Sequence, residues 1–163
     1  MTSIDWSKYN TNTTPKFSLK DTECFARVVQ IYDGDTLTAV IPLLNQFYKF
    51  SIRLEGIDTC ELSSTTQENK IIASKAKNRL IELVTQKTAE SISPDVKTYL
   101  LNNVELVYLC CEDFDKYGRI LASVKKTKED LESFSQILIK EKLAYSYDGK
   151  KKLTEIEQIN LLN

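Results

Sequence analysis

The segment Cys24–Glu55, with the sequence CFARVVQIYDGDTLTAVIPLLNQFYKFSIRLE, decides the expected fold. It contains three runs, 24–31, 36–41 and 47–55, that are rich in Val, Ile and Phe or alternate between apolar and polar residues. Such runs are typical of half-buried β-strands, and Asp-Gly-Asp at 33–35 is a turn signal between the first two. The segment therefore predicts an antiparallel meander of three strands.

After this segment the apolar residues change from the period of a strand to that of a helix. One apolar stripe predicts a helix of about 16 residues that carries Ile72, Ala76, Leu80, Leu83 and Val84. Two more strands are expected at Val104–Cys111 and Arg119–Val124, with a turn between them. Three strands, a helix and two further strands are the order of the five-stranded Greek-key OB barrel. We therefore expect an α+β, mainly β fold: a five-stranded OB-fold barrel with two to four flanking helices.

Three polar clusters predict where further helices begin. Ser93-Pro94-Asp95 predicts an N-cap, a proline in the first turn and a short helix to about Leu101. Thr127, with Asp130 three residues later, predicts the start of an amphipathic helix. This helix would carry Leu131, Phe134, Ile137 and Leu138. Thr154, with Glu157 three residues later, predicts a capping box at the start of a short terminal helix.

The chain has 163 residues, which fits one domain with one hydrophobic core. Residues 1–20 are polar and are expected to form a flexible arm, which leaves 21–163 as the single domain. No apolar run reaches the roughly 18 residues of a membrane span, and the first residues lack the pattern of a secretory signal. The cysteines form no CxxC pair and favour buried fillers over a disulfide framework: Cys24, Cys60, Cys110 and Cys111. These features lead us to expect an intracellular, cytoplasmic protein.

The chain contains no histidine, and its net charge is only −1. The lack of histidine excludes serine and cysteine triads with a histidine base, and most zinc enzymes. Acid–base chemistry would fall to carboxylates, Lys, Tyr or Cys. The near-neutral charge argues against a protein that only coats DNA, but leaves a local cationic site open.

Glycine occurs at only four positions, each among charged residues: Gly34, Gly56, Gly118 and Gly149. The surrounding segments are DGDT (33–36), RLEGIDTCE (53–61), DKYGR (115–119) and YSYDGKKK (145–152). Each segment alone reads as an ordinary turn, for which glycine and aspartate are suited. Together, two carboxylate turns and two arginines at strand ends favour a functional site over four unrelated turns.

The first three segments resemble the staphylococcal-nuclease-like, or thermonuclease, family. The pattern of that family is a DGDT turn, an R-L-x-x-x-D-T-P-E strand end and a D-K-Y-G-R turn on an OB barrel. The similarity covers about residues 24–152. The chain departs from the pattern in two places: Cys60 stands where the family has Pro, and 85–103 is expected to be an insertion.

The resemblance implies a calcium-dependent endonuclease that hydrolyses phosphodiester bonds of DNA and RNA with little sequence specificity. It implies calcium ligands at Asp35, Asp58 and the backbone carbonyl of Thr59. It implies catalytic roles for Glu61, as the carboxylate that activates water, and for Arg53 and Arg119, which hold the scissile phosphate. The residue types suit these roles, because a hard cation takes oxygen ligands, guanidinium groups bind phosphate in a bidentate manner, and a carboxylate can act as a general base.

Substrate contacts are implied for four further residues: Lys116, Tyr117, Tyr145 and Tyr147. The two C-terminal tyrosines could equally be aromatic residues at the edge of the core. Lys150–Lys152 stays open between phosphate steering and a solvated charge run. The implied partner is DNA or RNA, with no membrane and no obligate protein partner expected.

Two other functions compete with the enzyme. An inactive OB-fold module could bind single-stranded nucleic acid or a protein partner, because the fold alone does not distinguish binding from catalysis. A protein-interaction scaffold that uses 85–103 is the third interpretation. The intact set of carboxylates and arginines favours the enzyme.

Arg53 and Asp58 impose a geometric requirement on this site. Strict alternation places side chains five positions apart on opposite faces of a strand. The two side chains can reach one site only if the strand bulges or ends near Gly56. We therefore predict an irregularity at Gly56.

Overall fold

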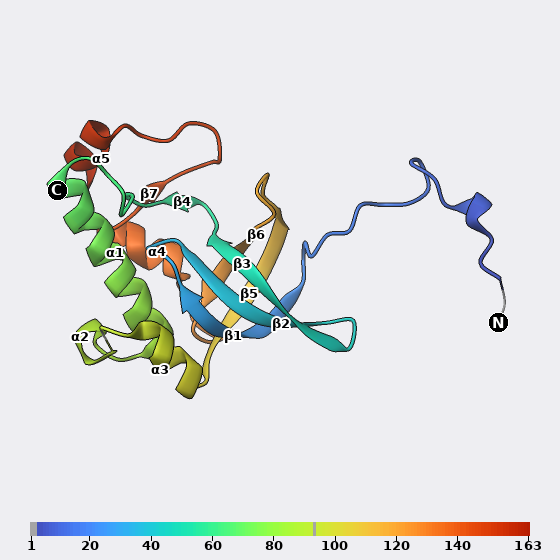
Figure 1. The fold of residues 1–163 in the computed structure, drawn as a ribbon. Helices are drawn as coiled ribbons and strands as arrows, with labels where there is room; N and C mark the ends of the chain where they lie inside the picture. The colour runs from blue at the N-terminus through green and yellow to red at the C-terminus, as the bar shows by residue number, and fades with distance from the viewer. Residues whose placement is uncertain (1–2, 93) are drawn as a thin grey trace.

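Five strands form a closed barrel at the centre of the computed structural model, which describes residues 3–92 and 94–163 (Figure 1). The barrel strands are β1 (Glu23–Ile31), β2 (Thr36–Leu43), β3 (Gln46–Leu54), β5 (Glu105–Phe114) and β6 (Ile120–Lys125). Their order around the barrel is β1-β2-β3-β6-β5, and β1 also pairs with β5. Neighbours are antiparallel except for β3 and β6, which are parallel. This arrangement confirms the predicted five-stranded OB barrel.

The boundaries of the barrel strands agree with the sequence prediction to within a few residues. The largest difference is at β5, which continues past the expected end at Cys111 to Phe114, through an irregularity in its pairing with β6. Sequence reasoning missed two short strands, β4 (Ile57–Asp58) and β7 (Tyr145–Ser146), which pair with each other. Two residues are too few for any period to be recognised.

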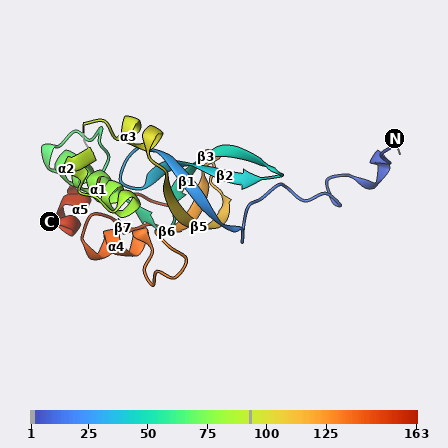
Figure 2. The ribbon, with the colours of Figure 1, turned by 90° about the horizontal axis from the view of Figure 1, so that it is seen from below.

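The helices α1 to α5 flank one side of the barrel (Figures 1 and 2). They are α1 (Gln67–Thr85), α2 (Ala89–Ile92), α3 (Val96–Asn102), α4 (Phe134–Lys140) and α5 (Glu155–Leu162), with a short 3₁₀ helix, η1 (Trp6–Lys8), in the N-terminal arm. The predicted stripe of α1 is buried from Ile72 to Val84, which confirms this helix. The capping box of Thr154 and Glu157 at the start of α5 is also confirmed.

Two predicted helix starts are wrong. Asp95, rather than Ser93, caps α3, because its side chain accepts the backbone N–H of Thr98 at 2.9 Å; Pro94 precedes the helix and Ser93 lies outside the described residues. The pair Thr127 and Asp130 closes a turn instead of opening a helix. The helix α4 starts later, at a capping box of Ser133 with Gln136, and Leu131 is 94% exposed. A Thr-x-x-Asp sequence satisfies the same hydrogen bonds in a turn as in a cap, so the sequence does not separate the two.

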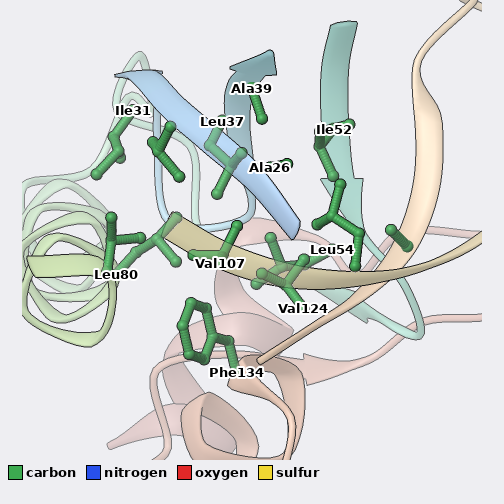
Figure 3. Packing of buried hydrophobic residues seen from close by; sticks show 14 of the residues in the cluster. Ala26, Ile31, Leu37, Ala39, Ile52, Leu54, Leu80, Val107, Val124 and Phe134 are labelled. Atoms are coloured by element: carbon green, nitrogen blue, oxygen red, sulfur yellow. The ribbon is translucent and has the colours of Figure 1, made fainter. Parts of the chain in front are cut away.

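The main core fills the barrel and continues to α1 and α4. Alternate residues of β2, such as Leu37 and Ala39, point inward, and Leu80 of α1 and Phe134 of α4 approach Val107 of β5 (Figure 3). Full burial of an aliphatic or aromatic side chain of this kind contributes roughly 1.5–3 kcal/mol. A second, smaller cluster packs α1 and α5 against the short strand β7 and consists of Cys60, Ile72, Ala73, Tyr145 and Leu162. The two clusters fix β4 and β7 beside the barrel.

The N-terminal arm runs away from the barrel on the side opposite α1 and α5 (Figures 1 and 2). Residues 3–18 are exposed, and Leu19 is the first residue to enter the core. That the arm is flexible stays a prediction, as does the interpretation of 85–103, which folds into α2 and α3, as an insertion. All four cysteines are free, and Cys60 and Cys111 are buried as apolar fillers. No helix in the described part of the chain is long and apolar enough to cross a membrane.

Candidate active site

A cavity of about 610 Å³ opens where four segments meet: the β1–β2 turn, the β3–β4 connection, the β5–β6 turn and the loop that follows β7. Nine of the ten site residues predicted from the sequence line it: Asp35, Arg53, Asp58, Thr59, Glu61, Lys116, Tyr117, Arg119 and Tyr147. The tenth, Tyr145, lies behind the wall and is 3% exposed. The structure therefore brings together residues that are spread over more than ninety positions of the chain.

The β1–β2 turn presents Asp35 to the cavity. One carboxylate oxygen accepts the Thr36 hydroxyl at 2.9 Å, and the other accepts the backbone N–H and the hydroxyl of Thr59 at 3.2 and 3.1 Å. The turn packs closely on α1: a Cβ at Gly34 would lie 2.6 Å from the Cβ of Ala76. Only glycine permits this approach, which explains its place in the DGDT segment.

The partners of the Asp35 carboxylate offset the cost of its burial only in part. Burial, followed by the charge of Asp33, raises the pKa of Asp35 from its ordinary value of 3.8 to about 6, although Arg53 acts in the opposite direction. Removal of a carboxylate from water disfavours its charged form. A bound cation would relieve this cost.

The predicted irregularity at Gly56 is present. The strand β3 ends at Leu54, Gly56 adopts a φ of +74°, and β4 begins at Ile57 and pairs with β7. The alternation of the strand is therefore broken between Arg53 and Asp58. As a result, Nη2 of Arg53 donates to Oδ1 of Asp58 at 2.7 Å. The prediction that the strand is interrupted near Gly56, so that Arg53 and Asp58 can meet, is confirmed.

Arg53 lies between the two carboxylates. Its side chain is only 7% exposed, and Nη1 is 2.9 Å from Oδ2 of Asp35. This ion pair does not have the geometry of a hydrogen bond. Within residues 3–92 and 94–163, Nη1 of Arg53 therefore has no hydrogen-bond partner. The ring of Tyr147 lies 5.9 Å from the guanidinium carbon. A buried donor without an acceptor is costly, so a phosphate oxygen at this position would be stabilised.

A buried polar network holds Asp58 from behind. The Tyr145 hydroxyl donates to Oδ2 of Asp58, the side-chain amide of Gln158 donates to Tyr145 at 3.3 Å, and that of Asn69 donates to Gln158 at 2.6 Å. Burial and the hydrogen bond to Asp58 raise the pKa of Tyr145, so the phenol remains protonated and remains a donor. Tyr145 thus supports the site from beneath, whereas Tyr147 lines the cavity.

Glu61 lies at the open side of the cavity and is exposed. Its Oε1 accepts Lys152 Nζ at 3.0 Å, and the same Nζ lies 3.0 Å from Oδ1 of Asp58. Burial acts against the charged ammonium, but the hydrogen bonds to Glu61 and Asp58 raise the pKa of Lys152 overall. The lysine therefore links the exposed carboxylate to the buried one.

The β5–β6 turn contributes the second arginine. Nε of Arg119 donates to Asp115 at 2.7 Å, and Arg119 lines the cavity. The ring of Tyr117 lies 5.4 Å from the Arg119 guanidinium carbon and 5.0 Å from Lys116 Nζ. The parallel pairing of Arg53 with Leu121 places this turn next to the end of β3.

Four lining residues were not assigned from the sequence: Tyr32, Asp33, Lys150 and Lys152. Asp33 belongs to the DGDT segment, and Tyr32 immediately precedes it, so their proximity in the chain was a usable signal. Lys150 and Lys152 lie in the lysine run that the sequence left undecided. Nothing in that run distinguishes Lys152 as the partner of Asp58 and Glu61.

The carboxylates of Asp35 and Asp58 lie at the inner end of the cavity, and Thr59 lines it beside Asp58. Carboxylate and carbonyl oxygens are the ligand types that a hard cation takes. No group of three or more His, Cys, Asp or Glu side chains is placed to hold a metal ion in the part of the chain that the structure describes. Calcium takes roughly six to eight oxygen ligands, so water or substrate oxygens would have to complete the shell.

The small barrel gathers arginines and carboxylates at one cavity, an arrangement that suits a nuclease-like domain. A model of the staphylococcal nuclease homologue family matches residues 51–162, and the chain therefore belongs to that family. The matched region contains every predicted site residue except Asp35, whose DGDT turn precedes it. No curated protein matches the chain. The family implies a nucleic-acid substrate and a hydrolytic activity.

Proposed function

We propose that the protein is a calcium-dependent endonuclease that cleaves phosphodiester bonds of DNA and RNA with little sequence preference. The observation that carries this proposal is the buried Nη1 of Arg53, which lacks a hydrogen-bond partner among the described residues and lies beside Asp35 in the cavity. A phosphate oxygen would supply the missing acceptor. The convergence of Arg119 and Glu61 on the same cavity supports cleavage rather than binding alone.

Each residue then has a chemical task. Arg53 and Arg119 hold the scissile phosphate and stabilise the charge that develops on its oxygens. Glu61 orients or deprotonates the attacking water, a contribution of roughly 10²–10⁴ in rate. Lys116 and Tyr117, at the exposed side, contact a neighbouring phosphate, and Tyr147 faces the nucleotide.

Calcium, when bound by Asp35, Asp58 and the Thr59 carbonyl, would neutralise phosphate charge and polarise the bond to be broken. Tyr145 serves this site indirectly, because its hydroxyl holds one oxygen of Asp58. The other oxygen of Asp58 accepts from Arg53. The two donors fix the orientation of the carboxylate.

Digestion of plasmid DNA, single-stranded DNA and RNA tests the proposal. Cleavage is expected with calcium and none with EDTA. A purified protein that cleaves none of the three with calcium, magnesium or manganese would refute the enzyme. Retained binding to single strands in that case would favour the inactive OB-fold module.

A further inference from the structure

We propose that the ammonium group of Lys152 competes with a metal ion for Asp58, and that a bound nucleotide phosphate displaces this ammonium group from Asp58. This inference rests on the proposed function. Its basis is the position of one ammonium group at 3.0 Å from both Asp58 Oδ1 and Glu61 Oε1. These two carboxylates are the proposed metal ligand and the proposed base. A metal ion that approaches Asp58 must therefore compete with a cation that is already there.

The charges in contact with Lys152, together with Asp35 and Arg53 beside Asp58, favour this competition. Asp35, Asp58 and Glu61 carry three negative charges, and Arg53 and Lys152 carry two positive ones, which leaves −1 for these five side chains. Loss of the Lys152 charge would change that balance to −2. A more negative site attracts a divalent cation more strongly, and the effect is large where side chains are shielded from water.

Of the two cations, only Lys152 is free to leave. Arg53 is 7% exposed and contacts both aspartates, whereas Lys152 is 49% exposed. Lys152 also lies in the loop between β7 and α5, outside any helix or strand. A flexible four-carbon side chain allows its ammonium group to move by several ångströms without a change in the backbone.

A phosphate in the cavity would give Lys152 an alternative partner. Lys152 lines the same cavity as Arg53 and Arg119, so a bound nucleotide brings anionic oxygens within its reach. Transfer of the ammonium group to the phosphate removes one positive charge from beside Asp58 and Glu61, and leaves Arg53 as the remaining cation on Asp58 Oδ1. Nucleotide and calcium should therefore increase each other's affinity, and Lys152 should carry part of this coupling.

Calorimetric titration of calcium chloride tests the inference, with and without saturating deoxyadenosine 3′,5′-bisphosphate. We expect Lys152→Gln to bind calcium alone about tenfold more tightly than the wild type, and to show a smaller enhancement by the nucleotide. Lys152→Arg keeps the positive charge and should retain the weak binding of the wild type. Lys151→Gln is the matched control, because it removes one charge from the same loop at an exposed residue that does not line the cavity.

A purely structural role for Lys152 gives a different result. In that case Lys152→Gln would lower the melting temperature without tighter calcium binding, and the inference would be overturned. Equal gains in Lys152→Gln and Lys151→Gln would overturn it as well, since only overall charge would then matter. The wild type could cleave with calcium while Lys152→Gln binds calcium with the same affinity as the wild type. That result would refute the inference and leave the proposed function intact. Tighter calcium binding by Lys152→Gln, without cleavage by the wild type, would refute the function and support the inference.

Discussion

The two walls of the cavity differ in how they are held. The inner wall is buried: the exposed fraction of the whole residue is 5% at Asp35, 6% at Arg53 and 1% at Asp58. Its side chains contact one another and a second layer of buried polar groups. The outer wall is exposed at Glu61 and Tyr117. The inner wall belongs to the core of the fold, whereas the outer wall is free to adapt to a substrate.

Because of this difference, substitutions in the two walls should have different effects on stability and on catalysis. Removal of one member of a buried ion-pair network leaves its partners as uncompensated charges, which costs stability. Exposed ion pairs contribute little, because water screens them. Substitutions in the inner wall should therefore affect both folding and activity, and those in the outer wall should affect activity alone.

The largest effect is expected for Arg53→Gln. This substitution leaves the buried carboxylates of Asp35 and Asp58 without their shared cation, and the free energy of unfolding should fall by about 3–5 kcal/mol. Cleavage should be lost as well. Urea unfolding measures the change, and Lys49→Gln, at an exposed position of the same strand, is the control. An unfolding midpoint equal to that of the wild type would show that the inner wall does not contribute to the fold.

Glu61→Gln should affect activity alone. Glutamine keeps the size of the side chain and can still accept from Lys152, but it is not a base. Turnover should fall by about 10²–10⁴ with nucleotide affinity and melting temperature nearly unchanged, because the loss falls on the transition state. Single-turnover cleavage and nucleotide titration measure the two quantities. Equal losses of turnover and affinity would make Glu61 a binding residue, and Glu68→Gln, at an exposed position of α1, is the control.

Arg119→Lys should produce an intermediate effect. The substitution keeps the charge but loses the planar fork that binds a phosphate through two nitrogens, so cleavage should fall about 10²-fold. The ion pair with Asp115 is partly exposed, and its loss should change the melting temperature only slightly. Cleavage kinetics and thermal unfolding test both statements. A marked fall in melting temperature would place Arg119 with the inner wall.

The sequence predicted the residues of the inner wall through the resemblance of DGDT (33–36) and RLEGIDTCE (53–61) to the family pattern, and local geometry added one requirement. The period of two residues located the barrel strands, and the odd spacing of Arg53 and Asp58 required the break at Gly56. The turn at Asp35 pairs directly with the strand that carries Arg53, through the register of Thr36 with Arg53. Short-range geometry thus agreed with the set of residues that the resemblance named, but did not select them.

The sequence did not predict the contacts that depend on packing far along the chain. Tyr145 and Tyr147 are two positions apart, which places them on one face of a regular strand. The strand β7 ends at Ser146, however, and Tyr145 is buried while Tyr147 lines the cavity. The contact of Lys152 with Asp58 joins residues that are distant in sequence, and neither residue type nor spacing selects Lys152 from its neighbours.

The smallest expected effect concerns the tether of the outer wall, at Glu155. Its carboxylate accepts the backbone N–H and the hydroxyl of Thr65 at 2.9 and 2.7 Å, which holds the segment after Glu61 against the start of α5. The Ser64 hydroxyl, close to the carboxylate but outside hydrogen-bond geometry, acts together with these donors to lower the pKa of Glu155 from 4.5 to about 2.

A carboxylate whose pKa is lowered by folding stabilises the protein above its unfolded pKa. That contribution is lost as the pH falls from about 4.5 to about 2. Glu155→Gln cannot titrate, so its melting temperature should fall less steeply over this interval than that of the wild type. Thermal unfolding at a series of pH values measures the two slopes, with Glu129→Gln, an exposed residue of another loop, as the control. Identical slopes for wild type and Glu155→Gln would mean that the segment after Glu61 is not tethered in solution, and that the outer wall is looser than its contacts suggest.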